Sequence, residues 1–225
     1  MQEERLSLPE EFFLLAFIQK SGYFKRKIFQ SMEFYTTASC VMELFYRGML
    51  MEKDQKLVLV ESKRTGLEFL DAILDIFFKQ NKNKSLLHWM INLPTRGLRT
   101  RHRIANHLVQ KKILKPVRKR FLYIIPVKSL LEVKSGIREE IFERMREKLL
   151  RCALMDEQTL GLALLMKQAG VLRRYFPEQD VSKIEYTFQK LQNEKMGNIS
   201  FRLIETINSA YKTLGATKWE SLGMW

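Results

Sequence analysis

The sequence lacks several features that would assign it to a well-known class of protein. No apolar run approaches the roughly 20 residues of a membrane-spanning helix; the run at 12–18 has only seven. The amino terminus, Met-Gln-Glu-Glu-Arg, carries acids where a secretory signal carries bases and then a long apolar segment. Two cysteines occur, Cys40 and Cys152, both in apolar helical patterns that favour buried free thiols. We therefore expect a cytoplasmic protein.

Motifs for catalysis and cofactor binding are missing as well. The chain has neither a G-x-x-x-x-G-K-[ST] loop nor a G-x-G-x-x-G turn after a strand. None of its three histidines has a partner at metal-ligand spacing. The neighbours Glu10-Glu11 and Glu139-Glu140 point in different directions on a helix, so we interpret them as capping or surface groups. We expect no enzymatic activity, no metal and no cofactor.

Positive charge, by contrast, is abundant. The formal net charge is +14 and the isoelectric point is about 9.8, which favours a polyanionic partner: nucleic acid, an anionic membrane or an acidic protein. Residues 96–124 hold ten Lys and Arg and no carboxylate. Over 96–151, 17 Lys and Arg stand against five Glu, a surplus of +12. Most of the positive charge thus lies in one quarter of the chain.

Helical periodicity dominates the sequence. Apolar spacing predicts helices over about 7–20, 31–46, 67–77, 86–90, 137–149, 179–192 and 198–211, and a basic helix around 104–108. Ser7 and Glu10 have capping-box spacing. Asp156 is expected to cap a central helix whose "LGLALLM" core is apolar almost all round and which ends near Gly170. Strands are predicted at 57–60 and at 120–126, the second closed by Pro126.

These elements predict a mainly α fold: a single compact helical domain over 1–225 with short β-hairpins. Two segments, "ASCVMELFYRGMLMEKDQKLVLVE" and "RIANHLVQKKILKPVRKRFLYI", share the order helix, turn and strand with a basic entry. A winged helix-turn-helix has the same order, which makes a duplex DNA-binding protein the alternative, although any helix packed on a hairpin also has it. The absence of Phe, Tyr and Trp between Arg96 and Arg120 disfavours single-stranded nucleic acid.

Five segments in order resemble one known family. They are "LSLPEEFFLLAF", "ASCVMELFYRGML", "TGLEFLDAIL", "RIANHLVQKKIL" and "TLGLALLMKQAGVLRRYF", and they cover the chain from Leu6 to about Tyr211. Together they resemble the Golgi phosphoprotein 3 family of peripheral membrane proteins that bind phosphatidylinositol 4-phosphate, as a divergent or prokaryotic-type member. The resemblance implies a mostly helical domain that holds a flat basic face and a hydrophobic hairpin against an anionic membrane.

The resemblance also implies where a lipid phosphate would bind. Family members use an aromatic residue before the second helix, an arginine within it, and a basic pair at the start of the "ANHLV"-type helix. Here the matching positions hold Ile28 or Phe29, then Thr37, then Leu98 with Arg101, so only Arg101 keeps the residue type. Neighbouring arginines would supply the missing charge. The predicted ligand-binding residues are Phe29, Arg96, Arg99, Arg101 and Arg103.

A second membrane element is expected after Pro126. In "VKSLLEVKS", Leu130 and Leu131 stand between lysines, which suits a hairpin tip that inserts apolar side chains while the lysines stay at the headgroups. Packing of both leucines on the adjacent helix is an equal alternative. The resemblance implies that a homo-oligomer forms through this segment.

We therefore expect a peripheral membrane protein that binds anionic lipid and no nucleic acid. Arginine suits this role because its planar guanidinium offers a phosphate two donors and stays charged. A duplex DNA binder that uses the same face is the alternative, and an adaptor for acidic protein tails also fits the charge.

Overall fold

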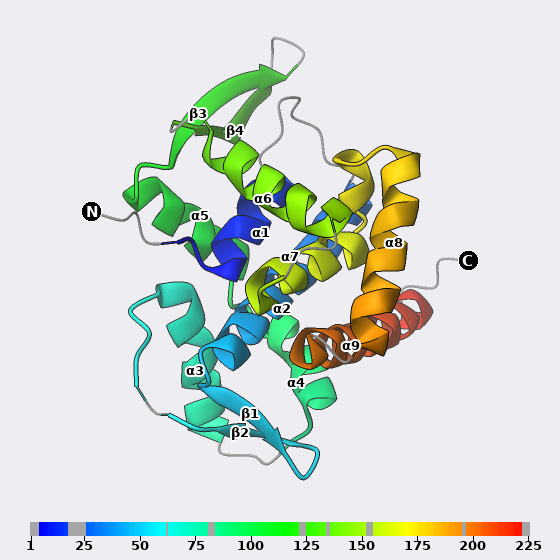
Figure 1. Cartoon of the computed structure of the whole chain (residues 1–225). Coiled ribbons are helices and arrows are strands. Elements are labelled where there is room, and N and C mark those ends of the chain that lie inside the picture. The colour runs from blue at the N-terminus through cyan, green and yellow to red at the C-terminus, as the bar shows by residue number, and fades with distance from the viewer. Residues whose placement is uncertain are drawn as a thin grey trace.

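The structure, a computed structural model, describes residues 5–17, 26–61, 63–80, 84–121, 125–133, 136–151, 155–194 and 197–221. Its helices are α1 (Leu8–Phe17), α2 (Arg26–Tyr46), α3 (Glu68–Gln80), α4 (Leu86–Asn92), α5 (Thr100–Gln110), α6 (Ile137–Arg151), α7 (Glu157–Gln168), α8 (Glu178–Asn193) and α9 (Asn198–Ser221), with short 3-10 helices η1 (Leu93–Arg96) and η2 (Leu172–Arg174). Strands β1 (Leu50–Lys53) and β2 (Lys56–Leu59) form one antiparallel hairpin, and β3 (Leu114–Phe121) and β4 (Ile125–Glu132) form another. The predicted mainly α fold is confirmed (Figure 1).

Helices α1 and α7 form the centre of the fold. Every residue of α1 from Leu8 to Ala16 is buried, and so is every residue of α7 from Thr159 to Met166. The two helices contact each other, and α2 packs on both (Figure 1). A helix that is apolar on all sides is stable only when other elements enclose it. The predicted central position of the "LGLALLM" helix is therefore confirmed.

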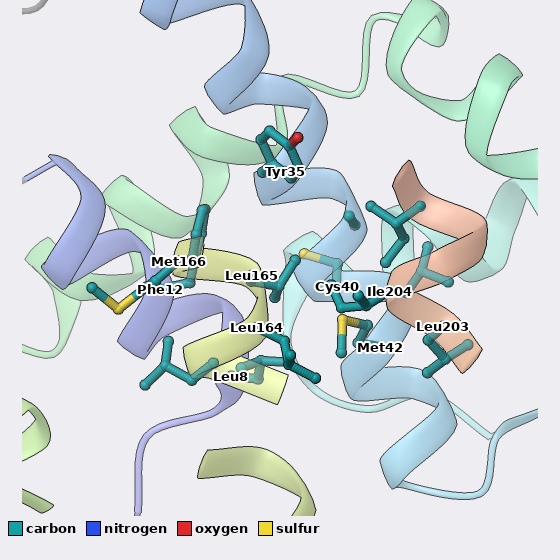
Figure 2. Packing of buried hydrophobic residues seen from close by; sticks show 14 of the residues in the cluster. Leu8, Phe12, Tyr35, Cys40, Met42, Leu164, Leu165, Met166, Leu203 and Ile204 are labelled. Atoms are coloured by element: carbon teal, nitrogen blue, oxygen red, sulfur yellow. The ribbon is translucent and has the colours of Figure 1, made fainter. Parts of the chain in front are cut away.

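Helices α2 and α9 complete this core. Figure 2 shows Cys40 and Met42 of α2 near Leu203 and Ile204 of α9, with Leu164 of α7 beside them. Each of these five side chains is at most 4% exposed. The predicted burial of Cys40 as a free thiol is confirmed, whereas Cys152 lies outside the described residues.

Three carboxylates are buried around the amino end of α1. Glu10 and Glu11 belong to its first turn and are each 1% exposed, and Glu43 of α2 is 5% exposed. Glu10 Oε2 accepts hydrogen bonds from the backbone N–H and the hydroxyl of Ser7 at 2.8 and 2.6 Å, which confirms the predicted capping pair. Glu43 accepts a hydrogen bond from the backbone N–H of Leu8 at 2.9 Å. All three negative charges thus meet the positive end of the helix dipole.

Each of these carboxylates also has a basic partner. The pairs are Lys111 Nζ with Glu10 Oε1 at 3.0 Å, Arg144 Nη2 with Glu11 Oε1 at 2.8 Å, and Arg47 Nε with Glu43 Oε1 at 2.7 Å. Burial raises the pKa of Glu11, although the charges of Arg144 and Arg5 oppose this shift. Of the two roles predicted for Glu10-Glu11, a position at the helix cap is confirmed, whereas a surface position is wrong because both side chains are buried.

The repeated pattern of a helix followed by a hairpin is present at α2 and at α5. After α2, Gly48 adopts a φ of +68°, and after α5, Lys112 adopts a φ of +57°. The backbone N–H groups of Gly48 and Lys112 each donate a hydrogen bond to the carbonyl oxygen three residues earlier, at 2.9 Å. The N–H groups of Met49 and Ile113 donate to the carbonyl oxygen five residues earlier, at 2.9 and 3.0 Å. Both helices thus end in a Schellman motif that directs the chain into its hairpin.

The strands differ from the prediction in both hairpins. The predicted strand at 57–60 corresponds to β2, and the prediction missed β1. The predicted strand at 120–126 is wrong, because β3 ends at Phe121 and Pro126 lies inside β4 opposite Arg120. Proline is tolerated there because each strand of a two-stranded sheet has an open edge.

The helices agree more closely with the predicted ranges. Asp156 caps α7 and Gly170 follows its end with a φ of +69°, as predicted. Helix α2 begins at Arg26 rather than near residue 31, and α9 continues to Ser221 rather than ending near residue 211. Within the described ranges, no helix combines the length and the hydropathy that crossing a membrane requires.

Gly161 lies where α7 packs against α2, and we predict that alanine there destabilises the fold. A Cβ atom at Gly161 would lie 2.2 Å from the Tyr46 hydroxyl oxygen, which Ser200 Oγ holds at 2.7 Å. Gly161→Ala should lower the free energy of unfolding by about 1–3 kcal/mol in chemical denaturation. Gly215→Ala in α9 is the control, because nothing lies within 4 Å of its added Cβ. It should be neutral or raise stability by up to about 1 kcal/mol, and equal stabilisation by both changes would contradict the close packing.

Asp156 should make the free energy of unfolding depend on pH in the acid range. Burial opposes its ionisation, but hydrogen bonds from Lys148 and Thr159 and the charge of Arg5 outweigh burial and hold the pKa of Asp156 well below its ordinary value of 3.8. Such a group stabilises the fold fully above its unfolded pKa and loses this contribution as the pH falls below that value. We predict that the free energy of unfolding decreases as the pH falls from about 4, and that Asp156→Asn flattens part of this decrease.

The asparagine keeps the helix cap, so Asp156→Asn should cost only about 1 kcal/mol at neutral pH. Denaturation curves across the acid range measure both effects. Glu205→Gln, at an exposed carboxylate of α9, is the control for the removal of one negative charge, and it should flatten the decrease less than Asp156→Asn does. An identical acid dependence in Asp156→Asn and the unmodified protein would show that the cap does not titrate as described.

Candidate anion-binding site at the amino end of α5

The predicted arginines gather where η1 leads into α5. η1 ends at Arg96, Gly97 adopts a φ of +67°, and Arg99 immediately precedes the helix with a φ of +48°. The left-handed conformation costs a non-glycine residue roughly 1–2 kcal/mol. These two left-handed residues, Gly97 and Arg99, turn the chain between η1 and α5. All four arginines lie within four residues of Thr100, the first residue of α5.

The amino end of α5 has no side-chain cap. The side chain of Arg99 makes no capping hydrogen bond, and the first turn contains no acidic residue. The first N–H groups of a helix have no acceptor within the helix, and the helix dipole adds partial positive charge there. Such an end is suited to an anion.

Arg96 and Arg99 are the two exposed members of the group. Arg96 Nη2 donates a hydrogen bond to the amide oxygen of Gln80 at 3.2 Å. Among the residues that the structure describes, no carboxylate pairs with Arg96 or Arg99. Their charges therefore face solvent.

Arg101 is half-buried and points to α2. Its Nε lies 3.9 Å from Glu33 Oε2, and its guanidinium lies 5.6 Å from the ring centroid of Phe17. Burial lowers the pKa of Arg101, and the charge of Glu33 opposes this shift. Arginine starts from so high a pKa that Arg101 stays charged.

Arg103 ties the start of α5 to α3. Its Nε donates a hydrogen bond to the carbonyl oxygen of Leu98 at 3.0 Å, and its Nη1 contacts Glu68 Oε1. The chain between η1 and α5 is thus anchored by a side chain of the helix that it precedes. Arg101 and Arg103 therefore carry charge that a carboxylate already offsets in part.

The other positions that the resemblance aligns with the family site hold no charge. Thr37 is fully buried, and its hydroxyl donates to the Glu33 carbonyl at 3.0 Å and lies 3.2 Å from the Thr100 hydroxyl. Leu98 is 8% exposed and belongs to the core. Phe29 lies within α2, not in a loop before it, because α2 begins at Arg26; its side chain lies outside what the structure describes.

Leu130 and Leu131 do not lie at a hairpin tip, so the predicted placement is wrong. Both belong to β4, near the base of the β3–β4 hairpin, where Leu114 pairs with Glu132. Leu130 packs against the core, whereas Leu131 is 43% exposed. Strand alternation sends adjacent residues to opposite faces, so only one of the two leucines can join the core.

Carboxylates from distant elements neutralise part of the basic segment. In the described part of 96–124, Lys111 pairs with Glu10 of α1, Arg101 with Glu33 of α2 and Arg103 with Glu68 of α3. Farther along, Arg144 pairs with Glu11 of α1 and Lys148 pairs with Asp156, the cap of α7. The +12 surplus counted in the sequence therefore overstates the charge that this segment exposes.

Sequence reasoning missed these acidic partners because no local spacing connects them to the arginines. One signal was available for Glu33. Glu33 lies four residues before Thr37, so both side chains lie on the same face of α2. Thr37 is the position that the resemblance aligns with the family's helix arginine, and a glutamate on this face therefore lies near the predicted site.

A pocket of about 480 Å³ lies beside the Arg103–Glu68 contact. Its charged lining residues are Arg64, Glu68, Asp71, Asp75 and Arg103. Arg64 pairs with Asp75 at 2.7 Å, and Asp71 accepts hydrogen bonds from Thr65. Because its two arginines already face carboxylates, this pocket is less suited to an anion than the helix end beside it.

Two comparisons with known proteins bear on the identity of the chain. A search of curated proteins found no match. The sequence model of the family described as Golgi phosphoprotein 3 (GPP34) matches residues 8–203, which is well over half of the chain and runs from the start of α1 into α9. The matched range includes α5 and all four arginines at its amino end. The chain therefore belongs to the Golgi phosphoprotein 3 family.

Proposed function

We propose that this chain is a peripheral membrane protein that binds anionic phospholipid headgroups at the amino end of α5. The observation that supports this function best is that Arg96 and Arg99 are exposed beside a helix end that Arg99 itself leaves uncapped. A headgroup phosphate could accept hydrogen bonds from a guanidinium and from backbone N–H groups together. Family membership favours a membrane over other polyanions.

The energy available at this site comes from several weak contributions. Each basic residue near an anionic leaflet contributes about 1 kcal/mol. Lys112 and Lys115 are also exposed, beyond the other end of α5 and at the start of β3. Arg96 and Arg99 would supply about 2 kcal/mol at the site itself, and Lys112 and Lys115 would add to this where the leaflet also reaches the other end of α5. Binding of this size is reversible and weakens as salt rises.

We expect charge, rather than headgroup shape, to govern recognition. Thr37 and Leu98 provide no cation where the resemblance implies basic residues, and Arg101 already faces Glu33. Phosphatidylinositol 4-phosphate would bind because its extra phosphate adds negative charge. Other acidic lipids at equal charge density should bind comparably.

The β3–β4 hairpin is the second membrane contact in this function. Leu131 and Val133 are 43% and 49% exposed near its base. Apolar side chains of this kind can enter the headgroup region while neighbouring lysines remain in water. Self-association through the segment after Pro126 stays a prediction.

Duplex DNA is the second candidate ligand. Helix α5 leads through its Schellman turn directly into the β3–β4 hairpin, as the recognition helix of a winged helix leads into its wing. The arginines at the start of α5 would then contact backbone phosphates.

The test is sedimentation with phosphatidylcholine vesicles that contain phosphatidylserine or phosphatidylinositol 4-phosphate. We predict that the double change Arg96→Glu and Arg99→Glu weakens binding at least tenfold at low salt. The physical reason is that each reversal removes about 1 kcal/mol of attraction and adds repulsion. Binding of the unmodified protein should also fall as salt rises.

The matched control is Arg173→Glu with Lys212→Glu, which reverses two exposed charges on η2 and α9. It should bind vesicles nearly as well as the unmodified protein. A mobility shift on random duplex DNA at the same salt tests the second candidate. Tight duplex binding without vesicle binding would reverse the ranking, and equal loss in both double variants would mean that no particular face is used.

A further inference from the structure

Two of the four arginines at the α5 site face a glutamate from another helix. Glu33 of α2 approaches Arg101, and Glu68 of α3 contacts Arg103. The four arginines carry four positive charges, and these two carboxylates offset two of them. An approaching anionic surface therefore meets a net charge of about half that of the four arginines alone.

Neither pair is buried. The Glu33 and Glu68 side chains are 31% and 70% exposed. At 3.9 Å the Arg101–Glu33 approach is longer than a direct hydrogen bond. Ion pairs in such positions are worth only about 0–1 kcal/mol. A phosphate brought close by a membrane can therefore displace either carboxylate, but it has to compete with it.

Both arginines have other contacts that hold them in place. The guanidinium of Arg101 lies over the ring of Phe17, and Arg103 Nε donates to the carbonyl oxygen of Leu98. These contacts do not involve the glutamate side chains. Neutralising a glutamate would thus release an arginine charge without removing the arginine from the site.

We infer that Glu33 and Glu68 are internal counter-charges that lower the affinity of the α5 site for an anionic membrane. They occupy Arg101 and Arg103 in the free protein, and headgroup phosphates replace them on the membrane. This role rests on the proposed lipid-binding function and adds two affinity-determining residues to it. The two carboxylates make binding depend more steeply on lipid charge, because only a strongly anionic surface competes with both.

The experiment measures vesicle binding of Glu33→Gln and Glu68→Gln at low salt, with phosphatidylserine in phosphatidylcholine vesicles as the probe. Each change should lower the lipid concentration for half-maximal binding about fivefold, the factor that matches about 1 kcal/mol for one released basic residue. The double variant should gain more than either single variant. The gain should shrink at high salt, where exposed charges are screened.

The control Glu194→Gln removes one negative charge and frees Lys190, its partner at 3.9 Å. It lies at the end of α8, on the side of the molecule away from α5 in Figure 1. This variant should show little gain. A gain equal to that of Glu33→Gln would assign the effect to net charge and overturn the inference.

A second comparison tests the pairing itself. In a background with Arg101→Gln, the change Glu33→Gln should give no further gain, and Arg103→Gln should abolish the gain from Glu68→Gln. A merely structural role for the glutamates would leave both gains in place. Thermal unfolding monitors folding, and Glu68→Gln provides an independent test if Glu33→Gln perturbs α2, because Glu68 is the more exposed residue.

The outcomes separate the two levels of the proposal. If the unmodified protein pellets with vesicles and neither glutamine variant binds more tightly, the counter-charge role is wrong and the lipid-binding function stands. If the unmodified protein and both glutamine variants all stay in the supernatant, the lipid-binding function is wrong and the counter-charge role falls with it.

Discussion

The pairing of buried carboxylates at the amino end of α1 is the constraint on which the rest of the structure depends. α1 is enclosed on all sides, so its first turn brings Glu10 and Glu11 out of water. A buried charge without a partner typically costs about 3–5 kcal/mol. Basic residues from distant elements therefore have to converge there, and Lys111 and Arg144 do so from the end of α5 and from α6.

This requirement also orients the candidate site. Lys111 holds the carboxyl end of α5 against α1, and Arg103 holds the turn before α5 through its hydrogen bond to the carbonyl oxygen of Leu98. Arg96 at the end of η1 and Arg99 just before α5 are then exposed to solvent. The same basic segment thus serves two purposes: part of its charge balances buried acids, and the remainder is available for a partner.

Much of the fold could be predicted because it depends on local patterns. The apolar spacing of α3, α6, α7 and α8 and the caps at Ser7 and Asp156 are properties of consecutive residues. The hairpins were harder to predict, since strand limits depend on pairing between segments, and Pro116 and Pro126 inside β3 and β4 obscured the signal. Of the candidate site, the sequence identified the arginines, but it did not identify Glu33 and Glu68, which come from two other helices.

The sequence by itself determined the helical class, the central position of α7, the family and the location of the basic segment, because each follows from residue type and spacing along the chain. Only the tertiary structure decided which of those positive charges stay available. Attraction between charges acts through space and falls with distance, so the acid that neutralises an arginine can lie anywhere in the sequence. Arg101 and Arg103 meet such acids, and Arg96 and Arg99 meet none among the described residues.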